Sequence, residues 1–214
     1  MTGIAIYVEG GGDTAHQKAT LRQGLDGLLN EVKSKARVKR LSWKLVPVGG
    51  RQAAYDAFIN AVRISQDDIN VLLVDSEAPI NVEAGDVVQN AKYRVEHLKK
   101  RDDWNFDGVH VERVHLMVQC MEAWIVADAD ALVTYYGQGF MRGVLPARQN
   151  LEEEPKADVY EKLARATRNT QKGEYGKIRH ASQLLSRISA EKVAERNPRF
   201  ATFTRWLTAS IESA

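Results

Sequence analysis

The sequence has little cysteine, no long hydrophobic run and no excess of charge of one sign. Its single cysteine, Cys120, excludes an intrachain disulfide framework and a cysteine-rich zinc site, and its place in an apolar run indicates a buried thiol. No apolar stretch reaches membrane-spanning length, and the N-terminus lacks a basic segment followed by an apolar signal core. We therefore expect a soluble, unexported protein of the cytoplasm.

Acidic and basic residues nearly balance, with 30 Lys and Arg against 28 Asp and Glu among 214 residues. The net charge of +2 excludes a protein that holds nucleic acid by bulk charge alone, so any phosphate-binding surface must be local. The apolar fraction of 44% is enough for a substantial core and predicts one compact unit.

Strand and helix patterns alternate along the first part of the chain. The first helix follows a capping box formed by Thr14 and Gln17 and is expected to reach about Lys33. A later helix is expected through Val88 and Leu98, followed by a charged turn. The order predicts an α/β fold with a mainly parallel, Rossmann-like sheet and helices on both faces. The strands are predicted over residues 3–8, 41–48, 69–77 and 114–118.

The pattern changes after Gly137, beyond which only helical periodicities are found. We expect an α/β core over 1–137 and a helical extension over 138–214 that packs on this core as part of one compact unit. The helices of the extension are predicted over residues 157–168, 180–188 and 198–211.

Three carboxylates lie at the ends of predicted strands: Glu9 after the first strand, and Asp75 and Glu77 at the end of the third. Ligands bind beyond the carboxyl ends of strands in open α/β sheets, and residues two apart on an extended segment point to the same side. Three converging oxygen donors predict a site for Mg²⁺ or Mn²⁺, such as the two-ion sites that cleave phosphodiesters. The alternative is that each acid is a solvated turn residue.

Phosphate-binding candidates lie in three places. Gly10 and Gly11 precede a helix start, where backbone amides can approach a phosphate, although a flexible turn is an equal alternative. Arg51 follows the second strand and could pair with a phosphate or remain a surface arginine. Lys172 and Lys177 belong to the one local concentration of cations, which is either a solvated loop or a source of charge for a scissile phosphate.

Glu122 follows an apolar strand directly, beside Trp124. A buried glutamate needs a partner. Glu122 is therefore either paired for structural reasons or part of the site.

Four strings resemble a bacterial Toprim-like family of unknown function, related to the Toprim domains of OLD-type nucleases, and the resemblance covers nearly the whole chain. The third string is long and unusual, which makes the resemblance specific. The strings are Val8-Glu9-Gly10, Leu72-Leu73-Val74-Asp75-Ser76-Glu77-Ala78-Pro79, His115-Leu116-Met117-Val118-Gln119-Cys120-Met121-Glu122-Ala123-Trp124 and Tyr175-Gly176-Lys177.

The resemblance implies roles for five residues. Toprim domains use a glutamate after the first strand, which Glu9 matches, and an Asp-x-Asp pair after a later strand. Asp75 matches the first member of that pair, whereas Glu77 replaces the second and lengthens the arm. By analogy with related nucleases, Glu122 joins the metal site and Lys177 stabilises the transition state. No catalytic tyrosine can be assigned, so a topoisomerase is not expected.

The resulting hypothesis is a divalent-metal-dependent nuclease or related phosphoryl-transfer enzyme. Under this hypothesis the protein acts on nucleic acid, forms oligomers, and works with an ATPase partner in a two-component phage defence or repair system. An alternative is a non-catalytic Toprim-like subunit of an ATPase complex that binds nucleotides or nucleic acid. A small-molecule phosphohydrolase is a third interpretation, in which Glu9 has no evident role.

Overall fold

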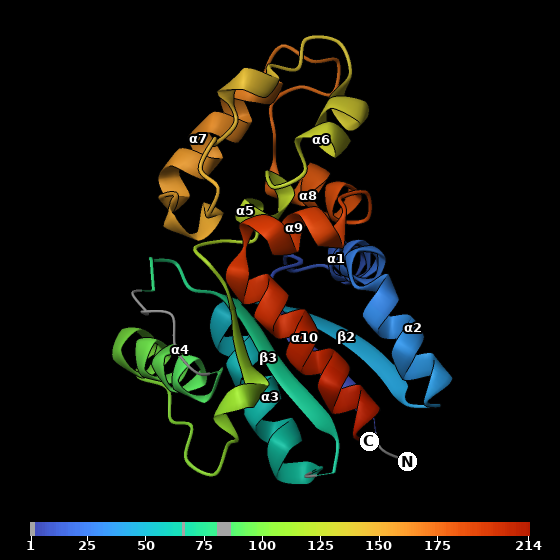
Figure 1. The fold of residues 1–214 in the computed structure, drawn as a ribbon, viewed down its shortest axis with the longest axis vertical. Coiled ribbons are helices and arrows are strands. Elements are labelled where there is room, and N and C mark those ends of the chain that lie inside the picture. Colours follow the sequence, from blue (N-terminus) through green and yellow to red (C-terminus); the bar gives the residue numbers. More distant parts are fainter. Residues whose placement is uncertain (1–2, 66, 81–86) are drawn as a thin grey trace.

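The computed structural model of the protein describes residues 3–65, 67–80 and 87–214. Within these residues, strands form a sheet in the order β2-β1-β3-β4 (Figure 1). Every neighbouring pair is parallel, so the predicted α/β fold with a Rossmann-like sheet is confirmed. The strands are β1 (Gly3–Glu9), β2 (Ser42–Gly49), β3 (Ile69–Asp75) and β4 (Val114–Met117).

Strand β3 explains why helices cover both faces of the sheet. Successive side chains of a strand point to opposite faces. Val71 and Leu73 therefore belong to one hydrophobic cluster, Leu72 and Val74 belong to another, and all four are fully buried. A strand that is apolar on both faces requires a helical layer on each side.

One layer consists of α3 (Arg51–Ile64) and α4 (Val87–Asp102), and the other includes α1 (Ala15–Leu28) and α10 (Pro198–Glu212). The helix expected through Leu98 continues to Asp102, where a charged turn had been expected. Its last turn carries basic residues, which interact favourably with the helix dipole. Part of the segment before this helix, residues 81–86, lies outside the described residues.

The predicted capping box at the start of α1 is confirmed, with Thr14 Oγ1 and the Gln17 side chain each accepting from the other's backbone. The expected continuation to Lys33 is wrong. α1 ends at Leu28, and α2 (Asn30–Val38) begins after Leu29 in a new direction. Leu28 and Leu29 are both buried, and the break lets these two consecutive side chains enter the core.

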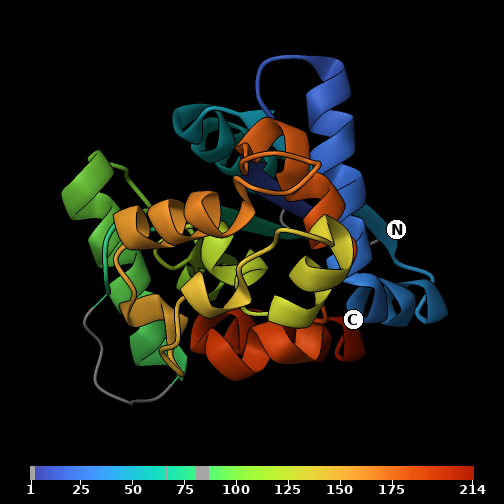
Figure 2. The same cartoon turned by 90° about the horizontal axis from the view of Figure 1, so that it is seen from above.

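The C-terminal helices lie beyond the carboxyl edge of the sheet, except α10, which returns along it (Figures 1 and 2). The helices predicted over 157–168, 180–188 and 198–211 are each found within a few residues of their expected bounds. None of the described helices is both long and apolar enough to cross a membrane. The remaining bounds are α5 (Glu122–Ile125), α6 (Ala129–Tyr136), α7 (Lys156–Thr167), α8 (Lys177–Leu185) and α9 (Ala190–Arg196).

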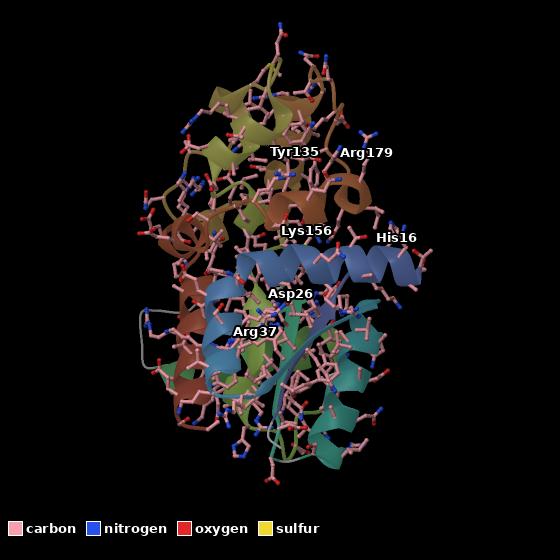
Figure 3. The ribbon with its side chains drawn as sticks, turned by 90° about the vertical axis from the view of Figure 1, so that its right-hand side faces the viewer. His16, Asp26, Arg37, Tyr135, Lys156 and Arg179 are labelled. Carbon is pink, nitrogen blue, oxygen red and sulfur yellow. The ribbon has the colours of Figure 1, made fainter. Side chains whose placement is uncertain are left out.

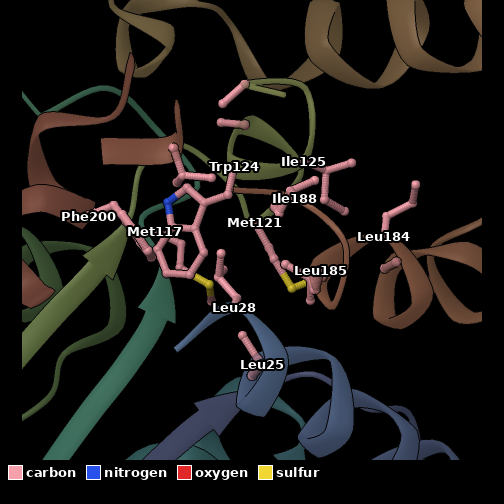
Figure 4. Packing of buried hydrophobic residues seen from close by; sticks show 14 of the residues in the cluster. Leu25, Leu28, Met117, Met121, Trp124, Ile125, Leu184, Leu185, Ile188 and Phe200 are labelled. Atoms are coloured by element: carbon pink, nitrogen blue, oxygen red, sulfur yellow. The ribbon is translucent and has the colours of Figure 1, made fainter. Parts of the chain in front are cut away.

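Trp124 lies where the two parts of the chain meet (Figure 4). Its ring centre is 4.8 Å from that of Phe200 on α10, and Leu28 and Met117 belong to the same cluster. This cluster joins strand β1 and helix α1 to helices α7, α8, α9 and α10. The boundary at residue 137 remains a prediction, and the described core crosses it.

Candidate active site

Asp75, the last residue of β3, lies at the middle of the carboxyl edge with a side chain that is 3% exposed. One carboxylate oxygen, Oδ1, accepts a hydrogen bond of 2.9 Å from the backbone amide of Met121. The other, Oδ2, lies 3.6 Å from Lys177 Nζ. The backbone therefore fixes one oxygen, while the second faces a cation.

Glu122 is fully buried at the first position of α5. Its Oε1 accepts a hydrogen bond of 2.9 Å from the Tyr175 hydroxyl, and its Oε2 accepts one of 2.7 Å from the Tyr160 hydroxyl. Burial and the charge of Glu122 raise the pKa of both phenols, which keeps them protonated as donors. Lys177 Nζ lies 3.9 Å from Glu122 Oε1. Glu122 thus has structural partners, the two tyrosine hydroxyls, and also faces Lys177, the cation that lies beside Asp75.

The electrostatics of the centre follow from two buried acids that share one lysine. Burial lowers the pKa of Lys177, but the charges of Asp75, Glu122 and Glu9 outweigh this effect and raise it. Burial raises the pKa of Asp75 to about 7; Lys177 opposes this rise, and Glu122 and Glu9 add to it. Asp75 therefore changes its protonation near neutral pH, and shifts of this kind cluster at functional sites.

Glu9, the last residue of β1, is joined to Asp75 through the backbone and to Arg51 through its side chain. Its Oε2 accepts from the Asp75 amide at 3.3 Å and from Arg51 Nη1 at 2.9 Å. Arg51 also makes a bidentate pair with Asp102, at 2.9 and 2.7 Å, and its guanidinium lies 5.1 Å from the centre of the Trp104 ring. Arg51 thus positions Glu9, and its donors are already engaged where phosphate binding had been predicted.

Glu77 does not point toward Asp75 as expected. β3 ends at Asp75, and Glu77 has a left-handed φ of 65°, so the two-residue alternation of an extended strand does not apply. Its Oε1 accepts a 2.6 Å hydrogen bond from Lys156 Nζ, at the start of α7. Glu77 and Lys156 form an ion pair beside the centre.

The structure thus joins Glu9 to Asp75 and pairs Glu77 with Lys156, and the use of this trio as metal ligands stays a prediction. In the part of the chain that the structure describes, no three His, Cys, Asp or Glu side chains form a group that could hold a metal ion. The chemistry of the donors still fits Mg²⁺ or Mn²⁺, because Mg²⁺ commonly uses one or two carboxylates and completes its shell with water and substrate phosphate. Asp75 and Glu122 provide such a pair, with more negative charge than the shared Lys177 neutralises.

The glycines at 10–12 have positive φ values of 116°, 88° and 61°, a region in which other residues are strained. The Gly10 amide donates to the Gly49 carbonyl at 2.8 Å and is therefore engaged within the fold, so phosphate binding at Gly10 and Gly11 stays a prediction. Gly10 and Gly11 nevertheless line a cavity of about 220 Å³ together with Lys177. The loop thus leaves an open cavity beside Lys177.

Lys172 lies apart from the acids, in the loop before α8, with Nζ 5.0 Å from the centre of the Tyr135 ring. Among the described residues, no hydrogen bond or ion pair joins the Lys172 side chain to Glu9, Asp75 or Glu122.

The sequence profile of a family described as a domain of unknown function, DUF4276, matches residues 8–208. The chain belongs to this family. None of the curated proteins and none of the solved structures matches it. The match of the DUF4276 profile runs from β1 to α10 and includes Glu9, Asp75, Glu122 and Lys177.

Sequence reasoning missed four partners of these residues: Asp102, Lys156, Tyr160 and Tyr175. Tyr175 stands in one of the resemblance strings, two residues before Lys177, which was its only signal. Lys156 and Tyr160 are four residues apart on α7 and so share a helix face, but nothing local connects them to their acidic partners, which are 79 and 38 residues away.

Proposed function

We propose that this DUF4276 protein is a divalent-metal-dependent enzyme that cleaves phosphodiesters, a nuclease with a Toprim-like centre. One observation carries the proposal: two buried carboxylates, Asp75 and Glu122, share Lys177 at the carboxyl edge of a parallel sheet. Excess acid of this kind attracts a divalent cation. Burial is the main cause that raises the pKa of Asp75 to about 7, with Glu122 and Glu9 adding to it, so a bound cation would favour the ionised carboxylate.

The residues take different roles in this proposal. Asp75 and Glu122 hold the cation, with Glu9 close enough to contribute charge. When bound, Mg²⁺ or Mn²⁺ would activate water and polarise the phosphate. Lys177 contacts the phosphate and stabilises the charge that develops on it. The Tyr160 and Tyr175 hydroxyls orient Glu122, so they act as positioning residues.

The Toprim-like assignment is supported by Glu9 and Asp75. They end neighbouring parallel strands, β1 and β3, and the Asp75 amide bonds to the Glu9 carboxylate. The same proposal includes an ATPase partner in a defence or repair system, as the resemblance implies.

A second candidate is a non-catalytic subunit that binds nucleotides or nucleic acid within an ATPase complex. The observation in its favour is that Glu9 and Glu77 already have cationic partners, Arg51 and Lys156. These pairs would compete with a metal for the carboxylates. Binding without cleavage would follow if they persist when the ligand is bound.

Cleavage of supercoiled plasmid and of single-stranded oligonucleotides in Mg²⁺ or Mn²⁺ tests the proposal. Asp75→Asn should lower the rate by about two orders of magnitude or more, because it removes a ligand charge. The matched control is Glu161→Gln, which replaces an exposed carboxylate on α7 with a carboxamide and should cleave like the parent. No metal-dependent cleavage by the parent would favour the non-catalytic subunit, and equal cleavage by Asp75→Asn would place the site elsewhere.

A further inference from the structure

Two cations lie over the ring of Tyr135 on α6, a third, Arg179, acts on it through its charge, and the proposed centre uses none of the three. Lys172 Nζ lies 5.0 Å and Arg187 Cζ lies 5.7 Å from the centre of the Tyr135 ring. Arg179 fixes the loop before α8, since its Nη2 donates to the carbonyl oxygens of Lys172 and Glu174. Figure 3 places Tyr135 and Arg179 in the helical half of the molecule. We call Tyr135, Lys172, Arg179 and Arg187 the Tyr135 patch.

The positive charge of this patch is not neutralised. Among the residues that the structure describes, no carboxylate forms an ion pair with Lys172, Arg179 or Arg187. Burial together with the charges of Arg179 and Lys172 lowers the pKa of the neighbouring His180. In a chain with a net charge of only +2, this local excess predicts an anion-binding surface.

Tyr135 favours an anion that carries aromatic bases. The Tyr135 ring is half-buried and is fixed by a 3.1 Å hydrogen bond from its hydroxyl to Gln183 Oε1. The cation–π interaction of a cation with an accessible ring is weak, whereas a phosphate accepts charge-assisted hydrogen bonds from the same cation. Phosphates can therefore draw Lys172 and Arg187 from the ring and leave its face to stack on a base. Duplex nucleic acid hides its base faces, but a single strand exposes them.

Helix α8 connects the patch to the acid centre. It begins at Lys177 and carries Arg179 and Gln183, which are four residues apart and share a helix face. Nine residues of helix are about 13 Å long. A strand on the patch can therefore reach Lys177 within a few nucleotides.

We propose that the Tyr135 patch binds single-stranded nucleic acid and guides it to Asp75 and Lys177. This inference rests on the proposed function, because it names the substrate of that site.

The test is the anisotropy of a labelled oligothymidylate of about twenty nucleotides, measured with the full chain in EDTA. Arg187→Glu should weaken binding about tenfold and reduce the slope of log K against log salt by about 0.7 for each lost phosphate contact. The matched control is Arg37→Glu, an equal charge change at an exposed residue of α2 in the other half of the molecule (Figure 3). It should bind like the parent.

A second pair of variants tests the ring. Tyr135→Leu should weaken binding about fivefold because stacking is lost, while Tyr135→Phe keeps the ring and should bind like the parent. Circular dichroism melting establishes that each variant is folded.

Three results would overturn the inference: equal losses for Arg187→Glu and Arg37→Glu, tighter binding of a duplex of the same length, or binding of phosphatidylserine vesicles but not of the oligonucleotide. Binding in EDTA does not require cleavage. Patch-dependent binding by a protein that never cleaves would therefore support the patch and refute the proposed function.

Discussion

Asp75→Asn removes an ionisable group from a buried site where four neighbouring charges act on it. Asparagine keeps the oxygen that accepts from the Met121 amide and has nearly the same volume, so packing should be preserved. The parent must keep a carboxylate where burial, Glu122 and Glu9 oppose its ionisation. We expect Asp75→Asn to stabilise the fold at neutral and alkaline pH while it lowers the rate of cleavage by about two orders of magnitude or more.

The magnitude follows from the pKa of Asp75, which rises from 3.8 to about 7. At about 1.36 kcal/mol for each pKa unit, this difference corresponds to about 4 kcal/mol. The folded state binds more protons than the unfolded state between these two pH values, so ionisation of Asp75 lowers the stability of the parent as the pH rises from about 4 to about 7. Asparagine cannot ionise and avoids this loss. The gain in the free energy of unfolding of the variant over the parent should be absent near pH 4 and complete above pH 7.

Urea unfolding followed by tryptophan fluorescence measures the prediction, since the chain has 4 tryptophans. The free energies of unfolding of the parent and Asp75→Asn are compared at pH 4, 6 and 8, so that titrations common to both cancel in the difference. The difference should change by about 4 kcal/mol in favour of the variant between pH 4 and pH 8. A difference that stays constant with pH, or that grows in favour of the parent, would refute the account of this centre.

Three further outcomes follow from the structure. Tyr175→Phe removes a hydrogen bond to the Glu122 carboxylate and should lower the free energy of unfolding by about 1.5–3 kcal/mol in urea, with slower cleavage; an unchanged midpoint would contradict the contact. Arg51→Ala leaves Glu9 without its cation and should cost about 3–5 kcal/mol by the same measurement, whereas a change below about 1 kcal/mol would mean that water replaces the guanidinium. Burial raises the pKa of the Cys120 thiol, so the folded protein should react with Ellman's reagent only as fast as it unfolds, and rapid reaction would contradict its burial.

The sequence predicted the sheet well because its signals are local. β3 is a continuous apolar run whose alternation serves two helical layers, and the acids at its end and at the end of β1 lie at the same edge. The Thr14 capping box is likewise visible within four residues. The helix break at Leu29 was missed because two consecutive buried leucines suit either one continuous helix or two shorter ones.

The candidate site was predicted only in part because its partners come from distant segments. Lys156 is 79 residues from Glu77, and Tyr175 is 53 residues from Glu122. No periodicity connects such pairs; only the fold does. The expected direction of the Glu77 side chain failed for a different reason. Side chains two residues apart point to the same side only while the strand continues, and β3 stops at Asp75.

The C-terminal helices are part of the candidate site rather than an accessory to it. Asp75 is the last residue of β3 and Glu122 comes shortly after β4, but Lys177 and the hydroxyls that hold Glu122 come from residues after 155. The sheet edge supplies the acids, and the extension supplies the cation that Asp75 and Glu122 share and the hydroxyls that hold Glu122.

Calorimetric titration with Mn²⁺ tests the central claim most directly, because it requires no knowledge of the substrate. The account predicts a Mn²⁺ site in the parent that is lost in Asp75→Asn and in Glu122→Gln but retained in the exposed control Glu161→Gln. Absence of Mn²⁺ binding by the parent, or equal binding by the parent and all three variants, would contradict the claim that these buried acids form a divalent-metal centre.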